Sequence, residues 1–245
     1  RSSDRSWAMA LYDALKMAKW EPFLDQYELV PGNTLQTSLE ESLQASSSGV
    51  ILWSSRTKDS EWCKRERTLM TQLKDERRTS SSPFNYVFAK LDDEPLPGFA
   101  KADLYMDFVD SPEGPRGANL LRLICGMRGI PLPPEAVDLA QQVDEDIRQL
   151  LRTIKGAVEA ANPTRLKQFA TSNDPGIAES PVPLQEAAQG LISMDLCEDA
   201  ITLLQTARLH FPQSVRVKQL EGLALRRLRQ YQDAIDILSE LKADG

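Results

Sequence analysis

The chain has 245 residues, of which 27% are charged and 41% hydrophobic, with a formal net charge of -7. The length allows two modest cores, and the acidic balance supplies no phosphate-binding surface, so we expect no direct nucleic-acid contact. Three widely spaced cysteines and one histidine fit neither a disulfide framework nor a metal cluster. The sequence shows no long apolar run and no signal segment, so we expect a cytoplasmic protein without membrane contact.

The first half of the chain alternates predicted helices with short apolar strands. Apolar residues at three-and-four spacing predict the helices, and continuous apolar runs predict strands that are buried on both faces. Such alternation is typical of a doubly wound, flavodoxin-like α/β fold with a parallel sheet in the order 2-1-3-4-5. Helices are expected over 6–20, 34–45, 62–73 and 118–127, and strands over 50–53, 86–89 and 104–108.

The first strand of that sheet is missing from the pattern. The chain opens on Arg1-Ser2-Ser3-Asp4 and continues directly into the first predicted helix. In the order 2-1-3-4-5 this strand is internal, so its absence would expose the hydrogen-bonding edges of its neighbours. We therefore expect the native protein to have further residues upstream that end in an apolar run.

A proline-rich segment, 130–134, marks the end of the predicted first domain, 1–133. A helical linker region is expected over 134–180, where apolar residues form one long stripe. The tail, 181–245, contains an internal repeat, because Asp199-Ala200-Ile201 matches Asp233-Ala234-Ile235. The offset between the two copies and the types of residue resemble tetratricopeptide (TPR) repeats, an all-α array with units of about 34 residues. Two units rarely bury a stable core, so more repeats are expected downstream.

Three separated motifs resemble a Toll/interleukin-1 receptor (TIR) domain. The sequence Trp-Cys-Lys-Arg-Glu at 62–66 follows the apolar strand 50–53 at the distance that this family shows. Residues 23–25 with 28–32 resemble the family's second strand and BB loop, and residues 1–5 resemble the end of the turn after its first strand. The resemblance covers residues 1–133 and implies the flavodoxin-like fold described above.

The resemblance also implies a chemistry. In NAD-cleaving TIR domains the glutamate of this motif is catalytic, and it corresponds to Glu66. Cleavage between nicotinamide and ribose leaves an oxocarbenium-like centre that a carboxylate can stabilise, and nicotinamide is already cationic in the substrate, so it needs no protonating acid to depart. NAD+ is then the substrate, and no cofactor is implied. By resemblance, Arg1, Phe23 and Trp62 would bind the substrate, while Asp25, Glu28, Pro31 and Gly32 would serve the loop and self-assembly.

Three functions follow as alternatives. A TIR unit with a repeat tail resembles prokaryotic antiviral defence proteins, which predicts a NAD+ glycohydrolase that self-association activates and that yields nicotinamide with ADP-ribose or a cyclic isomer. The tail would bind an unknown protein or peptide partner. The same motif occurs in TIR domains that act as signalling scaffolds, and Trp62 fits core packing as well. A nucleoside-processing α/β enzyme is the third alternative.

Overall fold

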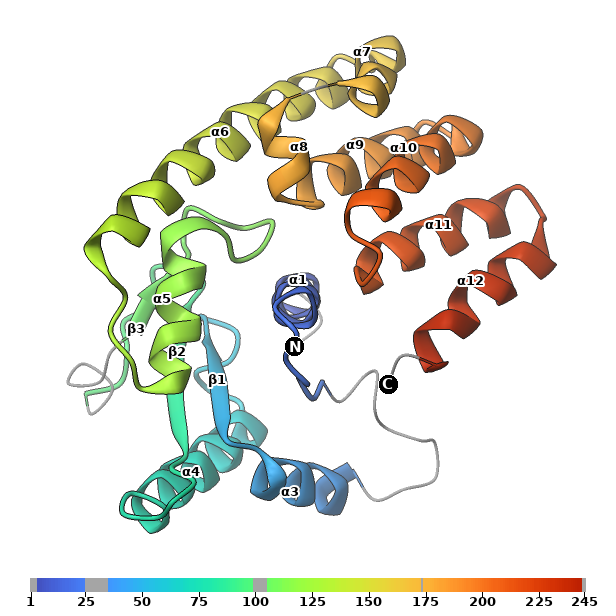
Figure 1. Cartoon of the computed structure of the whole chain (residues 1–245). Helices are drawn as coiled ribbons and strands as arrows, with labels where there is room; N and C mark the ends of the chain where they lie inside the picture. The colour runs from blue at the N-terminus through green and yellow to red at the C-terminus, as the bar shows by residue number, and fades with distance from the viewer. Residues whose placement is uncertain (1–3, 25–34, 99–104, 173, 244–245) are drawn as a thin grey trace. The chain divides into compact units, whose positions relative to one another are not determined.

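The computed structural model describes residues 4–24, 35–98, 105–172 and 174–243. The chain divides into two compact units. Unit 1 comprises Arg1–Tyr12 and Glu21–Ala140, and unit 2 comprises Asp13–Trp20 and Gln141–Gly245. Figure 1 labels their helices and strands. Each unit has its own core.

Unit 1 is a small α/β domain. The three strands found in its described residues are parallel and follow the order β1-β2-β3, with Val50 opposite Val87 and Phe88 opposite Tyr105. This order is that of the third, fourth and fifth strands in the expected sheet, and the expected helices of this half are also present. Its elements are α1 (Arg5–Met17), which ends in unit 2, α3 (Leu35–Ala45), β1 (Ser48–Trp53), α4 (Glu61–Glu76), β2 (Asn85–Lys90), β3 (Tyr105–Asp107) and α5 (Gly117–Arg128).

The second strand of the expected sheet is not formed over the described residues. Phe23 and Leu24 lie outside regular secondary structure, and Asp25 lies outside the described residues. In the order 2-1-3-4-5 the second strand pairs only with the first, and the described residues form no strand before β1. Within the described residues, β1 pairs only with β2.

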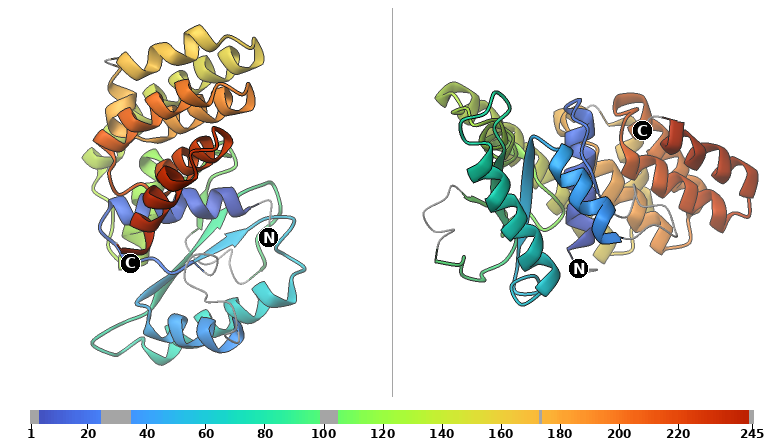
Figure 2. Two further views of the ribbon diagram at one scale, coloured as in Figure 1. Left: turned by 90° about the vertical axis from the view of Figure 1, so that its right-hand side faces the viewer. Right: turned by 90° about the horizontal axis from the view of Figure 1, so that it is seen from below.

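One core cluster of unit 1 forms where α4 packs on β1 and β2, and α5 also packs on the described strands. Phe88 and Trp53 meet edge to face with ring centroids 6.3 Å apart, and Phe88 is fully buried. Gly49 of β1 permits a close approach of α4, because a Cβ there would lie 2.9 Å from the sulfur of Met70. Helices α3 and α4 lie side by side (Figure 2). The apolar run of β1 therefore holds α4 at the position from which its polar side chains project.

Unit 2 is helical in its described residues. Consecutive helices from α9 onward pack side by side (Figure 2). Their core consists mainly of leucine, alanine and isoleucine side chains, many of which are fully buried. The elements that follow α5 are α6 (Pro134–Glu159), which begins in unit 1, α7 (Pro163–Lys167), the 3-10 turn η1 (Gln168–Thr171), α8 (Pro175–Glu179), α9 (Val182–Ser193), α10 (Cys197–His210), α11 (Val215–Arg227) and α12 (Tyr231–Ala243).

Three helical hairpins of unit 2 share one turn geometry at equal intervals along the chain. Ala161, Asp195 and Arg229 adopt positive φ angles of 46°, 63° and 63°. The residue after each donates its backbone N–H to the carbonyl five positions earlier, at 2.9, 2.9 and 3.0 Å. These bonds close the first helix of each hairpin with a Schellman-type end. The earliest hairpin lies inside the range 134–180 that the sequence predicts to be a linker.

Two glycines at equivalent positions in neighbouring hairpins, Gly156 and Gly190, differ in how closely other atoms approach them. A Cβ on Gly190 would lie 2.5 Å from a methyl carbon of Val158. Gly156 occupies the equivalent position in the preceding hairpin, and a Cβ there would meet nothing within 4 Å. Gly190 is therefore required by the approach of α9 to α6, whereas Gly156 is not.

Candidate functional site

Helix α4 carries the predicted catalytic residue. The helix begins after Ser60, whose hydroxyl accepts a hydrogen bond from the backbone N–H of Cys63 at 3.4 Å. Glu61 in the first turn adds a negative charge that favours the helix N-terminus. These residues place Glu66 in the second turn of α4, where its side chain is half-buried.

Glu66 lies on a groove between α3 and α4. The groove has a volume of about 440 Å³, which is within the range of small-molecule pockets, about 300–1,000 Å³. Leucine side chains from both helices form apolar walls, and charged and amide side chains lie among them. The lining residues are Leu39, Glu40, Leu43 and Gln44 of α3, with Trp62, Lys64, Arg65, Glu66, Thr68, Leu69 and Gln72 of α4.

Trp62 and Glu66 are joined by a hydrogen bond on the wall of the groove. The indole Nε1–H of Trp62 donates to Oε1 of Glu66 at 2.9 Å. The two residues are four positions apart on α4, a spacing that brings side chains onto one face of a helix. The sequence predicted both as site residues, and the structure brings them together.

Arg77 ties the far end of α4 to the end of α3. Its guanidinium donates to the backbone carbonyl of Ser46 at 2.9 Å and to that of Gln44. Charged hydrogen bonds of this kind are stronger than neutral ones. Arg77 therefore holds the two walls of the groove together, a role that no sequence motif indicated.

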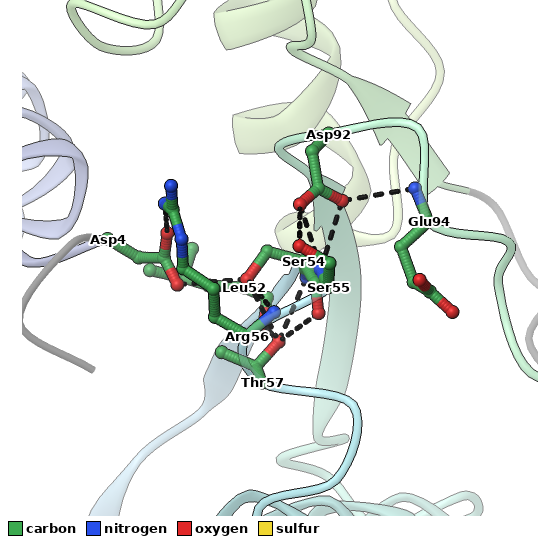
Figure 3. Close-up of polar contacts among 8 residues, drawn as sticks. All are labelled: Asp4, Leu52, Ser54, Ser55, Arg56, Thr57, Asp92 and Glu94. Carbon is green, nitrogen blue, oxygen red and sulfur yellow. Dashed lines mark hydrogen bonds and ion pairs between the residues drawn. The ribbon is translucent and has the colours of Figure 1, made fainter.

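A second polar cluster lies at the carboxyl edge of the sheet, where ligands often bind in this fold class (Figure 3). The hydroxyl of Ser54 donates to one oxygen of Asp4 at 2.9 Å, and Nη1 of Arg56 donates to the other at 3.1 Å. Asp4 and Ser54 are 5% and 1% exposed. Both oxygens of Asp4 are thus bound to the loop after β1, which gives this carboxylate a structural role.

Asp92 holds the loop after β1 to the loop after β2 (Figure 3). The backbone N–H and the hydroxyl of Ser55 donate to its Oδ2 at 2.8 and 2.6 Å, and the N–H of Glu94 donates to Oδ1 at 3.1 Å. Desolvation acts to raise the pKa of Asp92, but these hydrogen bonds outweigh it and hold that pKa below its ordinary value. This carboxylate is ionised and engaged by its own loops.

The predicted site residues are only partly placed. Glu66 and Trp62 lie together on the groove, whereas Phe23 is half-buried and is not among the residues that line it. The predicted assembly and substrate residues Arg1, Asp25, Glu28, Pro31 and Gly32 lie outside the described residues.

Sequence reasoning missed the side chains that make the groove. Leu39, Leu43 and Leu69 belong to the apolar spacing that predicts helices over 34–45 and 62–73, but nothing in the sequence assigned them to a groove. Their spacing was the available signal, but a helical stripe does not tell a groove wall from a packed face.

Another pocket of unit 1, of about 460 Å³, lies among β3, α5 and the start of α6. Its only carboxylate, Asp138, is exposed, whereas Glu66 is half-buried and accepts an indole hydrogen bond. The groove between α3 and α4 is therefore the better candidate for chemistry. Over the part of the chain that the structure describes, no group of three metal-binding side chains converges, and no helix is long and apolar enough to cross a membrane.

The fold is that of a parallel α/β domain with a carboxylate on a groove between two helices. Comparison with family models identifies the family: the TIR domain model matches residues 1–124 of the 245. The chain belongs to the TIR domain family, as its motifs predicted. No curated protein and no solved structure matches the chain.

Proposed function

We propose that this TIR domain is a NAD+ glycohydrolase with Glu66 as its catalytic carboxylate. The observation that carries the proposal is the position of Glu66 on the groove between α3 and α4, in contact with Trp62. The family includes NAD-cleaving enzymes, and Glu66 occupies the motif position of their catalytic glutamate. Other carboxylates of unit 1, such as Asp4 and Asp92, are held by their own loops.

The proposed reaction needs only one carboxylate. The bond between the nicotinamide nitrogen and C1 of ribose breaks, and its electron pair leaves with nicotinamide, which becomes neutral. The ionised Glu66 stabilises the positive charge that develops on the ribose. Water then adds to C1 and loses a proton, so that NAD+ and water give nicotinamide, ADP-ribose and H+. Attack by an atom of the ADP-ribose itself would give the cyclic isomer in place of water addition.

The groove offers charge complementarity to a dinucleotide. Lys64 and Arg65 line it together with Glu66, and their positive charges suit the diphosphate of the substrate. Lys64 is also paired with Glu61 at 2.6 Å, so Arg65 is the more available cation of the two. Arg1 and Phe23 remain proposed substrate contacts, and the loop with Asp25, Glu28, Pro31 and Gly32 is proposed to close the site when two TIR domains associate.

Unit 2 is proposed to be a TPR-type module that senses or assembles. Its support is the hairpin geometry, which recurs at the interval of a TPR unit, about 34 residues. Stacked hairpins present extended surfaces to proteins or peptides, so we propose such a partner, of unknown identity. The whole chain would act in the cytoplasm in prokaryotic antiviral defence, where triggered self-association starts NAD+ consumption.

The test is loss of NAD+ by the full-length protein, concentrated or crowded to promote association. Wild type is compared with Glu66→Gln and with Glu76→Gln, an exposed glutamate at the end of the same helix that does not line the groove. Chromatography identifies the products. Turnover by wild type and Glu76→Gln, but not by Glu66→Gln, is the expected result.

Two other outcomes would replace the proposal. If demonstrated oligomers leave NAD+ intact, the signalling scaffold becomes the function to pursue, and the partner of unit 2 becomes the next target. Turnover of free nucleosides without NAD+ cleavage would instead identify a nucleoside-processing enzyme.

A further inference from the structure

The hydrogen bond between Trp62 and Glu66 links two groups on one wall of a groove. The indole N–H has no acceptor capacity, so it can only donate, and its acceptor is the carboxylate oxygen Oε1 at 2.9 Å. Both side chains line the same groove, among the leucines of α3 and α4. A donor in that position restricts the rotation of the carboxylate and limits the directions in which its second oxygen can point.

We propose that Trp62 is a positioning residue, whose indole N–H orients the Glu66 carboxylate toward the groove and favours its ionised form. This inference rests on the proposed function for its catalytic meaning, but the hydrogen bond itself can be tested without any reaction. It also changes the role that the sequence suggested for Trp62, from contact with substrate to control of the residue that acts on it.

The chemistry of the proposed reaction makes this control useful. A carboxylate that must stabilise a developing cation has to be ionised and held close to one orientation, since catalytic groups lose effect when misplaced by about 1 Å. A hydrogen bond to the charged form of a carboxylate favours that form. The apolar leucine walls favour the neutral form by removing water, Lys64 and Arg65 on the same groove favour the ionised form, and Glu40 opposes it. The indole also favours the ionised form, without adding a charge that would repel the cationic nicotinamide ribose.

The hydrogen bond is tested by the indole N–H signals of protein labelled with ¹⁵N-tryptophan. The chain has four tryptophans, and the Trp62→Phe variant identifies the signal of Trp62 by its loss. Trp7 and Trp53 are matched internal controls, because their indoles donate to the backbone carbonyls of Ser111 and Pro95, which do not titrate. We expect the Trp62 signal alone to shift as pH falls and Glu66 is protonated.

Glu66→Gln completes the spectroscopic test. The glutamine keeps an oxygen that can accept the indole N–H but does not titrate, so the Trp62 signal should lose its pH dependence. A Trp62 signal that ignores pH in the wild type, or that still titrates in Glu66→Gln, would overturn the proposal. Wild-type signals of Trp7 and Trp53 in the Trp62→Phe spectrum establish that the variant is folded.

Kinetics then separate positioning from substrate contact. Phenylalanine at position 62 keeps an aromatic face for the substrate but has no N–H. We expect Trp62→Phe to lower kcat about ten-fold with KM unchanged, because a catalytic group misplaced by about 1 Å can lose up to about 100-fold in rate. The acid limb of its kcat profile should move to higher pH, because the ionised carboxylate loses a donor.

The opposite kinetic result, a change in KM rather than in kcat, would contradict the proposal. A raised KM with unchanged kcat and an unchanged pH profile would assign Trp62 to substrate contact. If the wild-type protein does not cleave NAD+ at all, the proposed function fails, while the indole titration still decides whether Trp62 positions Glu66. The two failures are therefore distinguishable.

Discussion

The two units of this chain are built in different ways. Unit 2 uses one hairpin geometry three times, with a left-handed residue at 161, 195 and 229. In unit 1 the groove depends instead on single contacts, notably the bond of Trp62 to Glu66 and the bonds of Arg77 to the end of α3. A residue of unit 2 can be judged against its equivalent in the neighbouring hairpin, whereas each polar residue of unit 1 must be judged by what it contacts.

In unit 1, structural and functional carboxylates can therefore be separated by what each of them contacts. Asp92 accepts hydrogen bonds from Ser55 and Glu94 on the loops around it, so its charge is used within the fold. Glu66 lies on a groove large enough for part of a small molecule. Substitution of a structural carboxylate should change stability, and substitution of a functional one should change activity.

The largest effect is expected for Glu66→Gln. NAD+ turnover should fall about 100- to 1,000-fold, the usual range when a group that stabilises a charged transition state is removed. The unfolding temperature should stay at the wild-type value, because glutamine can still accept the indole N–H of Trp62. Initial rates and thermal melts of the same preparations check both parts. A variant that loses stability in proportion to its activity would put Glu66 among the structural carboxylates.

Alanine substitutions at the two equivalent glycines of unit 2 should change its stability in opposite directions. Gly190→Ala should destabilise the unit by about 1–3 kcal/mol, because the new Cβ would lie 2.5 Å from Val158 across the packed helices. Gly156→Ala should stabilise it by about 0.5–1 kcal/mol, since alanine is the better helix former and the site is open. Urea unfolding followed by helical circular dichroism measures both. Equal effects at the two positions would contradict the contrast in packing.

Asp92→Asn should reduce the stability of unit 1 by about 1–2 kcal/mol at neutral pH, because charged hydrogen bonds from Ser55 and Glu94 are weakened. The folded pKa of Asp92 is lowered, so its contribution is present above the unfolded pKa and is lost as pH falls through the folded one, below about 4. The wild type should therefore lose stability in acid more steeply than Asp92→Asn. Acid unfolding of the two proteins provides the measurement. If their stabilities fall with pH in parallel, Asp92 does not cause the loss of stability in acid.

Much of the fold could be predicted because its signals are local. The apolar run at 50–53 and the spacing of Leu39 and Leu43 indicated β1 and α3 directly. The repeat was visible because Ala200 and Ala234 occupy equal positions in hairpins of similar composition. The earliest hairpin has Leu166 at that position and a second helix interrupted by η1, so its sequence does not resemble the other two.

The site was predictable only where a motif named it. The Trp-Cys-x-x-Glu pattern identified Glu66 and Trp62, and their spacing of four on a helix allows the contact that forms. The bonds of Arg77 to Ser46 and of Asp92 to Ser55 join positions that are far apart in the sequence. A pattern of local periodicity has no information on such pairs. These hydrogen bonds form only when the folded sheet brings the loops and helices around β1 and β2 together.

The smallest effect is expected at Glu221 of α11, which is 2% exposed. Its nearest described charge is Arg208 of α10 at 3.6 Å, and Glu240 of α12 competes for the same guanidinium at 3.9 Å. Lys218 of α11 is directed to Glu240, at 3.5 Å. Desolvation by burial raises the pKa of Glu221, an effect that Arg208 reduces and Glu240 adds to.

The raised pKa gives a pH dependence with a definite sign. Stability from a protonated Glu221 is fully present below its unfolded pKa and is lost as pH rises through the folded value. Local opening of α11 should therefore cost less at pH 7 than at pH 4 in the wild type, by about 1 kcal/mol or less. Glu221→Gln should flatten this dependence, because the amide does not titrate. Hydrogen exchange of peptides from α11 at several pH values, corrected for the intrinsic rate, measures it. If the opening of α11 in Glu221→Gln depends on pH as it does in the wild type, the pH dependence belongs to Glu240 or another group. The Glu240→Gln variant would then decide between them.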